Sequence, residues 1–462
     1  MGWLAVPVAI LLGGVILVTE HVRKKRNGPF DFLFAVSGIY FMCFSVIPIY
    51  CAFLLPEELD SWSWILMNSF SSTSYFYASL CSLIGYLFIV AGYSACSRFR
   101  QGQADDMQRE RPDKKELFPE SRMFAASAVI ACIGLISFVI YTSSIGGWSK
   151  LFEYAILLRS GTDFIESKWL FFKNLSTFIM VASLCFFALA KEAERSSIRS
   201  WSRLCFVLTF GLSMVLLFHK AGRMEMVSYL ITFPLVNVVR NKAWNIKLIF
   251  GFGFFFVLIV LFGKQIFNYF IYPEGVGNQM SNIGSEAGNI ISKVLLEFSF
   301  PYVTLANAIQ TFPYENMYRF FVDIPLGVLH LVPSRLIPLN LPETVSELNT
   351  WMFQTKGTTP VDFVSFGYFN LGIAGVAILG FAFGGLLIFM ERIFSANKNW
   401  FIVIYRVHWI LYFAFRIMYS DPQMAYQSAF TYLIGLGLVL MFTNINRHRT
   451  AANNGWKMNL IH

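Results

Sequence analysis

Four arginines in four separate segments are the residues whose chemistry stands out in this sequence: Arg159, Arg223, Arg335 and Arg416. A guanidinium group keeps its charge and donates several N–H groups in one plane, so it binds phosphate in a multidentate way. Four such groups that converge on one cavity would bind a phosphate or diphosphate. Each alone is equally typical of a lipid-headgroup anchor or a structural ion pair.

The turn HKAGRME adds two more basic groups, His219 and Lys220, to Arg223. It joins two apolar runs of about 15 residues each, which is short of a bilayer crossing. The sequence therefore predicts a short hairpin whose turn lies below the outer membrane surface. Ionisable groups at membrane depth are costly unless they face a cavity or an anionic partner, so this turn favours an anion site. A snorkelling basic turn at the interface is the alternative.

The segment 264–362 is the other place where we expect chemistry, with Arg319 as a further phosphate-binding candidate. The groups there that could accept a proton from a hydroxyl are His330, Asp323, Glu347 and Asp362. We prefer His330, because a turn at Pro333 would bring it close to Arg335; a buried, hydrogen-bonded structural histidine is the alternative. No metal-ligand spacing or Gly-rich phosphate loop occurs on this side, so no metal or cofactor is expected.

The composition indicates which elements position these groups. The chain has 462 residues, of which 56% are hydrophobic, 18% aromatic and only 14% charged, and its mean hydropathy is +0.57. This predicts an all-α polytopic integral membrane protein with about eleven transmembrane helices. The apolar runs are near 3–19, 30–55, 75–96, 123–143, 169–190, 204–219, 225–239, 245–263, 366–390, 399–418 and 426–444.

The basic residues predict the orientation of these spans. Alternate loops hold 23 of the 36 lysines and arginines, which places those loops in the cytoplasm and the N-terminus and the large loop outside. The net charge of +9 thus reports topology, and no nucleic-acid partner is expected. We divide the chain into an N-terminal membrane part (1–263), the large outer loop (264–362) and a C-terminal membrane part (363–462). Within the loop, 286–310 predicts interfacial helices, and the prolines after it predict irregular turns.

Several segments carry a family resemblance through their order. They are GGWSKLFEYAILLRSG, HKAGR, FSFPY, LVPSRLIPLNLPE and TTPVDFVSFGYFNLGIAGVAILGFAFGG. Together with the span order, over nearly the whole chain, they resemble the bacterial Wzy-type polymerases of O-antigen and other oligosaccharide repeat units. The chain departs from the family pattern at Ser334, which separates Pro333 from Arg335. It departs again at Ser365, where an acidic residue is common and Asp362 is the nearest carboxylate.

The resemblance implies a GT-C-like, metal-independent membrane glycosyltransferase in the bacterial cytoplasmic (inner) membrane. Its substrate would be an undecaprenyl-diphosphate-linked oligosaccharide, and its partners membrane lipids and a chain-length regulator protein. Arg159, Arg223 and Arg335, with Lys220, would stabilise the leaving diphosphate, and His330 would accept the proton of the acceptor hydroxyl. The other substrate-binding candidates are His219, Arg416, Arg319 and Asp362. An O-antigen ligase-like glycan transferase and a flippase of lipid-linked oligosaccharides are the alternatives.

Overall fold

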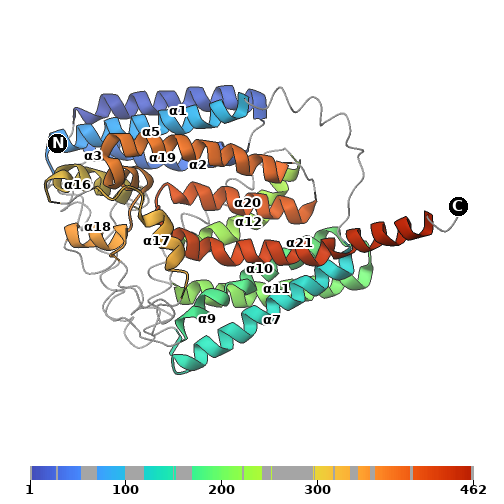
Figure 1. Cartoon of the computed structure of the whole chain (residues 1–462). Helices are drawn as coiled ribbons and strands as arrows, with labels where there is room; N and C mark the ends of the chain where they lie inside the picture. Colours follow the sequence, from blue (N-terminus) through green and yellow to red (C-terminus); the bar gives the residue numbers. More distant parts are fainter. Residues whose placement is uncertain are drawn as a thin grey trace.

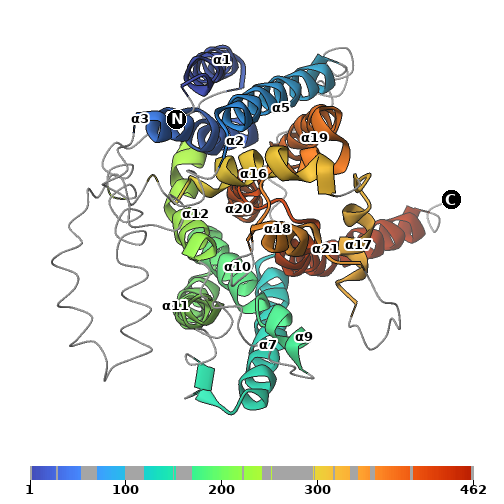
Figure 2. The ribbon, with the colours of Figure 1, turned by 90° about the vertical axis from the view of Figure 1, so that its left-hand side faces the viewer.

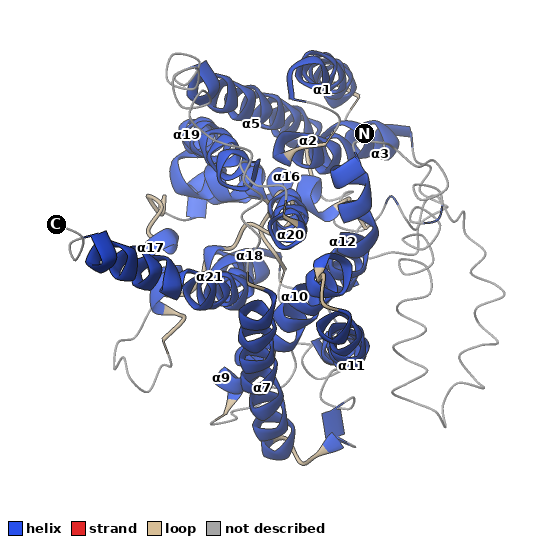
Figure 3. Ribbon diagram, turned by 90° about the vertical axis from the view of Figure 1, so that its right-hand side faces the viewer, coloured by secondary structure: helices blue, strands red, loops and turns tan. Residues whose placement is uncertain are grey.

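The structure is a computed structural model and is all-helical where it is described. It describes residues 3–27, 30–53, 70–98, 119–148, 150–151, 169–220, 223–241, 251, 295, 297–315, 318–332, 342–353, 359–395 and 399–458. Within these ranges every regular element is a helix and no strand occurs (Figures 1 and 3). The prediction of an all-α, multi-pass membrane protein is thereby confirmed.

Eight stretches of the described chain are long and apolar enough to cross a membrane. They are formed by α1 (Ala5–Asn27), the continuous α2 (Phe32–Phe41), η1 (Met42–Val46) and α3 (Ile47–Phe53), α5 (Ser72–Arg98), α7 (Glu120–Ser144), α9 (Leu170–Leu175) with α10 (Phe178–Glu192), α11 (Ser196–Lys220), α19 (Phe363–Ser395) and α21 (Pro422–Met458). Each coincides with a predicted apolar run.

Two further predicted runs form shorter or more polar helices. α12 (Arg223–Asn241) has 19 residues and α20 (Trp400–Arg416) has 17, so at about 1.5 Å per residue they extend about 28 and about 26 Å. The predicted run 245–263 lies almost wholly outside the described residues. The described chain therefore contains eight candidate spans, against the eleven predicted.

The predicted short hairpin is wrong for α11. This helix has 25 residues, about 37 Å, which is enough for a full crossing. The apolar run underestimated its length because its first two turns, SSIRSWSR, are polar and still helical. His219 and Lys220 are consequently the last residues of a full-length candidate span.

Three helices of the large loop lie at one end of the bundle, which we call the cap end. They are α16 (Phe300–Glu315), α17 (Asp323–Leu329) and α18 (Val345–Phe353), at the left of Figure 1 and toward the viewer in Figure 2. α16 packs against α5 and α19 with Tyr302, Leu305 and Phe312 buried, so it is inserted among the spans. α17 and α18 lie in the part of the loop that was expected to be irregular. α17 can form there because Pro325 falls in its first turn, where proline is tolerated.

The helix ends away from the cap end carry many basic residues. Arg240 of α12 lies with its guanidinium 4.2 Å from the ring centroid of Trp400. The buried Arg23 of α1 forms a 2.9 Å ion pair with Asp31, just before α2. The distribution of charge between the two ends therefore agrees with the asymmetry seen in the sequence.

A kink in α19 orients the segment that leads into α17. The helix is interrupted at Leu371 and at Gly372, whose φ is +61°. The backbone N–H of Arg319 donates to the carbonyl of Phe369 at 3.2 Å, and that of Phe320 to the carbonyl of Asn370 at 3.2 Å. Carbonyl groups near the kink thus gain partners from the loop.

The turn between α20 and α21 is bonded to the residues that precede α19. The backbone N–H of Phe363 donates to the carbonyl of Ile417 at 3.0 Å, and that of Ser420 donates to the carbonyl of Val361 at 2.8 Å. This pairing holds the start of α19, the end of α20 and the start of α21 together at the cap end.

Candidate functional site

Two lysines from different helices face the same place at the cap end. Lys173 lies on α9, and Thr177 follows it by four residues in a nearly continuous helical segment, so the two share a helix face. The ammonium group of Lys220, at the end of α11, donates to the hydroxyl oxygen of Thr177 at 3.1 Å. Lys173 and Lys220 also interact electrostatically.

The carboxylate of Glu225 interacts with both lysines. Glu225, in the first turn of α12, lies 3.7 Å from the ammonium nitrogen of Lys220, and its side chain is 45% exposed. It also interacts electrostatically with Lys173. An ion pair with this long separation and a half-exposed carboxylate is weak. The charge of the pair of lysines is therefore only partly compensated among the described residues.

Arg416 extends this basic group toward α20. Its guanidinium carbon lies 4.7 Å from the ring centroid of Tyr412, a cation–π contact. Tyr412 in turn interacts electrostatically with both Arg416 and Glu225. The Nε atom of Arg416 is buried and has no hydrogen-bond partner among the described residues. We define Lys173, Lys220, Glu225 and Arg416 as the basic cluster.

His219 is placed next to the basic cluster but has a structural environment. Its side chain is fully buried. Nδ1 lies 2.7 Å from the carbonyl oxygen of Leu151, and Nε2 lies 2.8 Å from the hydroxyl of Tyr141. A carbonyl can only accept, so in the neutral imidazole Nδ1 donates and Nε2 accepts from Tyr141. Both ring nitrogens are thus used to join α7, α11 and Leu151.

Of the four arginines that the sequence analysis ranked first, Arg416 belongs to the basic cluster and the other three cannot be placed in this geometry. Arg159 and Arg335 lie outside the described residues. Arg223 begins α12, three residues after Lys220, and its side chain is likewise outside what the structure describes. Their roles stay predictions.

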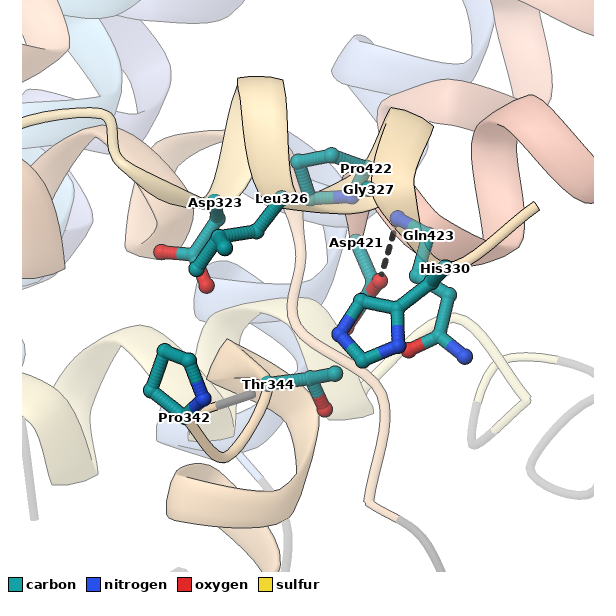
Figure 4. A pocket seen from close by; sticks show the side chains of 9 residues that line it. All are labelled: Asp323, Leu326, Gly327, His330, Pro342, Thr344, Asp421, Pro422 and Gln423. Atoms are coloured by element: carbon teal, nitrogen blue, oxygen red, sulfur yellow. Dashed lines mark hydrogen bonds between the residues drawn. The ribbon is translucent and has the colours of Figure 1, made fainter. Parts of the chain in front are cut away.

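His330 lines a small pocket between α17, the start of α18 and the start of α21 (Figure 4). Its Nε2 atom is buried and has no hydrogen-bond partner in the described part of the chain. Asp323, Asp421 and Thr344 line the same pocket. Its volume is about 10 Å³, room for about one water molecule. The pocket can therefore orient His330 through a water but cannot hold a sugar.

Asp421 anchors this pocket from the side of α21. One carboxylate oxygen accepts from the backbone N–H groups of Gln423 at 2.8 Å and Met424 at 3.3 Å. The other accepts from the backbone N–H of Ser346, in the first turn of α18, at 3.3 Å. A buried carboxylate at the first turns of two helices is stabilised by their N–H groups and dipoles.

Arg319 is bound within the protein. Its Nε and one terminal nitrogen donate to the two carboxylate oxygens of Asp323 at 2.6 and 2.7 Å, a bidentate pair. A third hydrogen bond of 2.6 Å joins it to the carbonyl of Glu343. This arrangement ties the segment before α17 to the one before α18.

The carboxylates of Asp362 and Glu347, the two other candidate bases, are engaged at helix starts. Asp362 accepts from the backbone N–H groups of Val364 at 2.9 Å and Ser365 at 3.0 Å, and from the Ser365 hydroxyl. Burial raises the pKa of Asp362 to about 7, and these hydrogen bonds oppose that rise. Glu347 accepts from the backbone N–H of Thr344 at 2.6 Å, and its own N–H donates to the Thr344 hydroxyl, which is a capping box.

The sequence analysis missed two residues of this region. Lys173 stands as a single lysine in LFFKNL, and a lone charge inside an apolar run is itself a signal of function. Asp421 precedes a proline, and an acidic residue followed by proline is a recognisable helix start. In the described chain, no three His, Cys, Asp or Glu side chains are grouped so that they could hold a metal.

Comparisons of the chain with known proteins found no match. No protein-family model, no curated protein and no solved structure matches the chain.

Proposed function

We propose that the protein is a membrane glycosyltransferase that polymerises lipid-linked oligosaccharide repeat units. The growing glycan leaves its undecaprenyl diphosphate and joins a hydroxyl of the incoming lipid-linked repeat unit. The bond between the sugar C1 and the diphosphate oxygen breaks, and a bond between C1 and the acceptor oxygen forms. The diphosphate departs with the electron pair, and the proton of the acceptor hydroxyl passes to a base. In this proposal the fold is GT-C-like with eleven spans.

The observation that carries the proposal is the basic cluster at the ends of membrane-spanning helices. Three cations, Lys173, Lys220 and Arg416, are accompanied by one half-exposed carboxylate, Glu225. A lipid diphosphate has its charge at this depth and its chain in the bilayer. Cations fixed there would stabilise the charge that develops on the leaving diphosphate. Arg159, Arg223 and Arg335 are proposed as further donors.

The short stretch of chain between the basic cluster and the His330 pocket supports binding of an acceptor sugar beside the diphosphate. Arg416 of the basic cluster and Asp421 of the pocket are five positions apart in the sequence, at most about 18 Å of chain. A diphosphate on the basic cluster and an acceptor sugar beside His330 would thus lie on the same surface. His330 is the proposed base, and the water-sized pocket under it would position the imidazole.

The location proposed for this reaction is the outer face of the bacterial cytoplasmic membrane. The cap end would face outward, because most of the basic residues at the helix ends of the described chain lie at the other end. Membrane lipids and a chain-length regulator are the proposed partners.

Glycan chain length in a deletion strain tests the function directly. Complementation with the wild type should restore a ladder of long glycans, and Lys220→Met should leave single repeat units at normal protein level. Arg159→Ala, Arg223→Ala and Arg335→Ala should behave like Lys220→Met. Lys191→Met is the matched control, because Lys191 is an exposed lysine in the last turn of α10, at the other end of the bundle.

Two outcomes would replace the proposal. Long glycans that accumulate on the carrier in the deletion strain would indicate a ligase. Repeat units trapped on the cytoplasmic face would indicate a flippase.

A further inference from the structure

In the segment 318–332, which contains α17, the polar side chains of Arg319, Asp323 and His330 lie on the inner side, and most of the exposed side chains are apolar. Asp323 and Gly327 are buried, and His330 lines the same pocket. A methyl group added at Gly327 would lie 2.9 Å from the Tyr426 ring and 3.0 Å from the backbone nitrogen of Gln423. This face of α17 is therefore packed closely on the start of α21.

The exposed side chains of the segment are mostly apolar, and four of them, spaced four apart in the sequence, are what we call the outward stripe. Its exposed fractions are 68% for Phe320, 37% for Ile324, 51% for Val328 and 40% for Val332. Leu329 beside it is 38% exposed. A helix on a water-exposed surface shows the reverse pattern, with polar residues outside.

The outward stripe contains no charge. The two charged residues of 318–332 are Arg319 and Asp323, and they are bound to each other. An apolar row of this kind marks a surface that contacts a membrane or another protein. The inverted polarity of α17 thus needs an apolar partner.

The packing of α17 on α21, a candidate membrane-spanning helix, points to lipid as that apolar partner. α17 packs at the start of α21, at the edge of the bundle (Figure 2). α21 exposes Met424, Leu433 and Met441 by 40%, 53% and 51% along a candidate span. The outward stripe and these side chains are thus exposed apolar residues of two elements that pack on each other.

We propose that α17 is embedded in the bilayer leaflet at the cap end, with the outward stripe on the acyl chains. The inference does not depend on the proposed enzymatic function. Its consequence is that the pocket of His330, Asp323 and Asp421 lies directly beneath a lipid-embedded helix, at the boundary between bilayer and protein.

The backbone before α17 holds this orientation. Phe320 and Phe321 have φ values of +51° and +59°, in the left-handed region that side chains other than glycine rarely adopt. They are kept there by hydrogen bonds to Asn370, from the Phe320 N–H to its carbonyl and from the Phe321 N–H to its side-chain oxygen. Such strain persists where the surrounding structure holds the backbone in place. The kinked α19 therefore fixes the direction in which the outward stripe points.

Photocrosslinking to lipid tests the proposal on the full chain. p-Benzoylphenylalanine replaces Val328, and the protein is reconstituted in vesicles of phosphatidylethanolamine and phosphatidylglycerol. Irradiation should give phospholipid adducts on the peptide that contains position 328, detected by mass spectrometry. Position 433 on α21 is the positive control. Position 343 is the negative control, because Glu343 is exposed and its side chain is polar.

The outcomes at the three positions decide between occupants. Lipid adducts at 328 at a level similar to 433, with none at 343, support the proposal. Adducts of position 328 to another part of the chain or to a second copy, without lipid, overturn it. If the protein with the label at 328 does not fold, the label at 324 carries the same expectation, and the absence of lipid adducts there also overturns it.

Discussion

The ammonium group of Lys220 lies 3.1 Å from the hydroxyl oxygen of Thr177, one helical turn after Lys173. Two like charges are therefore held together where membrane-spanning helices end, and Glu225, the carboxylate that interacts with both of them among the described residues, is half exposed. Like charges repel, and an anion bound between them offsets that repulsion by attracting both, so this geometry favours binding of a phosphate group.

Removal of either ammonium group should weaken diphosphate binding. For Lys173→Met and Lys220→Met we expect the dissociation constant of farnesyl diphosphate to rise about 10- to 100-fold, since a hydrogen bond to a charged group contributes about 1.5–3 kcal/mol. Fluorescence titration of the purified protein measures this, with Lys191→Met as the control. Farnesyl monophosphate and phosphatidylglycerol separate a diphosphate site from general headgroup binding. Equal affinity of wild type and both variants would disprove the site.

The contact between His219 and Tyr141 should matter for stability and not for anion binding. Tyr141→Phe removes the hydroxyl that donates to Nε2 and leaves a buried acceptor unsatisfied, which costs about 1–3 kcal/mol. The melting temperature in detergent should fall, while the affinity for farnesyl diphosphate stays unchanged. A normal melting temperature together with lost binding would instead place His219 in the anion site.

Asp362 should make the stability depend on pH. Its pKa in the folded protein is about 7, above the usual value of 3.8, so the folded state holds the proton more tightly than the unfolded state. The stabilisation is complete below about pH 4 and is lost as the pH rises through about 7. The melting temperature of the wild type should fall more between about pH 5 and about pH 8 than that of Asp362→Asn. Asparagine keeps an acceptor for Val364 and Ser365 but cannot ionise, so identical pH profiles would show that Asp362 does not titrate in this range.

The fold was predictable where the length of an apolar run decides the structure. Apolar runs long enough to cross a bilayer have few alternatives to helix, and most of the runs recur in the structure with small shifts of their ends. The prediction failed at α11, because SSIRSWSR continues a helix for which the apolar run gives no sign. At α17 part of the chain expected to form irregular turns is a helix of seven residues, which Pro325 in its first turn helps to begin.

The site was less predictable, because residue type does not reveal hydrogen-bond partners. His219, Asp362 and Glu347 looked like free acids and bases, and each is held by backbone or hydroxyl groups that the sequence cannot identify. Lys173 was overlooked because its role depends on Lys220, 47 positions later in the numbering. Arg159 and Arg335 stay untested by the geometry.

The ion pair of Arg319 and Asp323 should stabilise the region around α17. Asp323→Asn leaves the guanidinium without its carboxylate, and we expect a loss of about 1–3 kcal/mol, less than for a fully buried pair because Arg319 is partly exposed. Thermal melting of Arg319→Gln, Asp323→Asn and the double variant forms a double-mutant cycle. Strictly additive losses would show that the two side chains do not interact.

His330→Gln tests the base of the proposed reaction. Glutamine keeps a similar size and some hydrogen bonding but cannot accept the proton of the acceptor hydroxyl, so turnover should fall by about 10²- to 10⁴-fold. The rate of glycan elongation with lipid-linked repeat units in reconstituted vesicles measures this, and an unchanged melting temperature is the control for folding. The buried Nε2 of His330 faces a water-sized pocket beside Asp421, so Asp421→Asn, which keeps an acceptor for the start of α21, should lower turnover less. Near-normal turnover in His330→Gln would make the histidine structural. Asp323, which is paired with Arg319, and Asp362 and Glu347, which are occupied as helix caps, would then be poor replacements for it as the base.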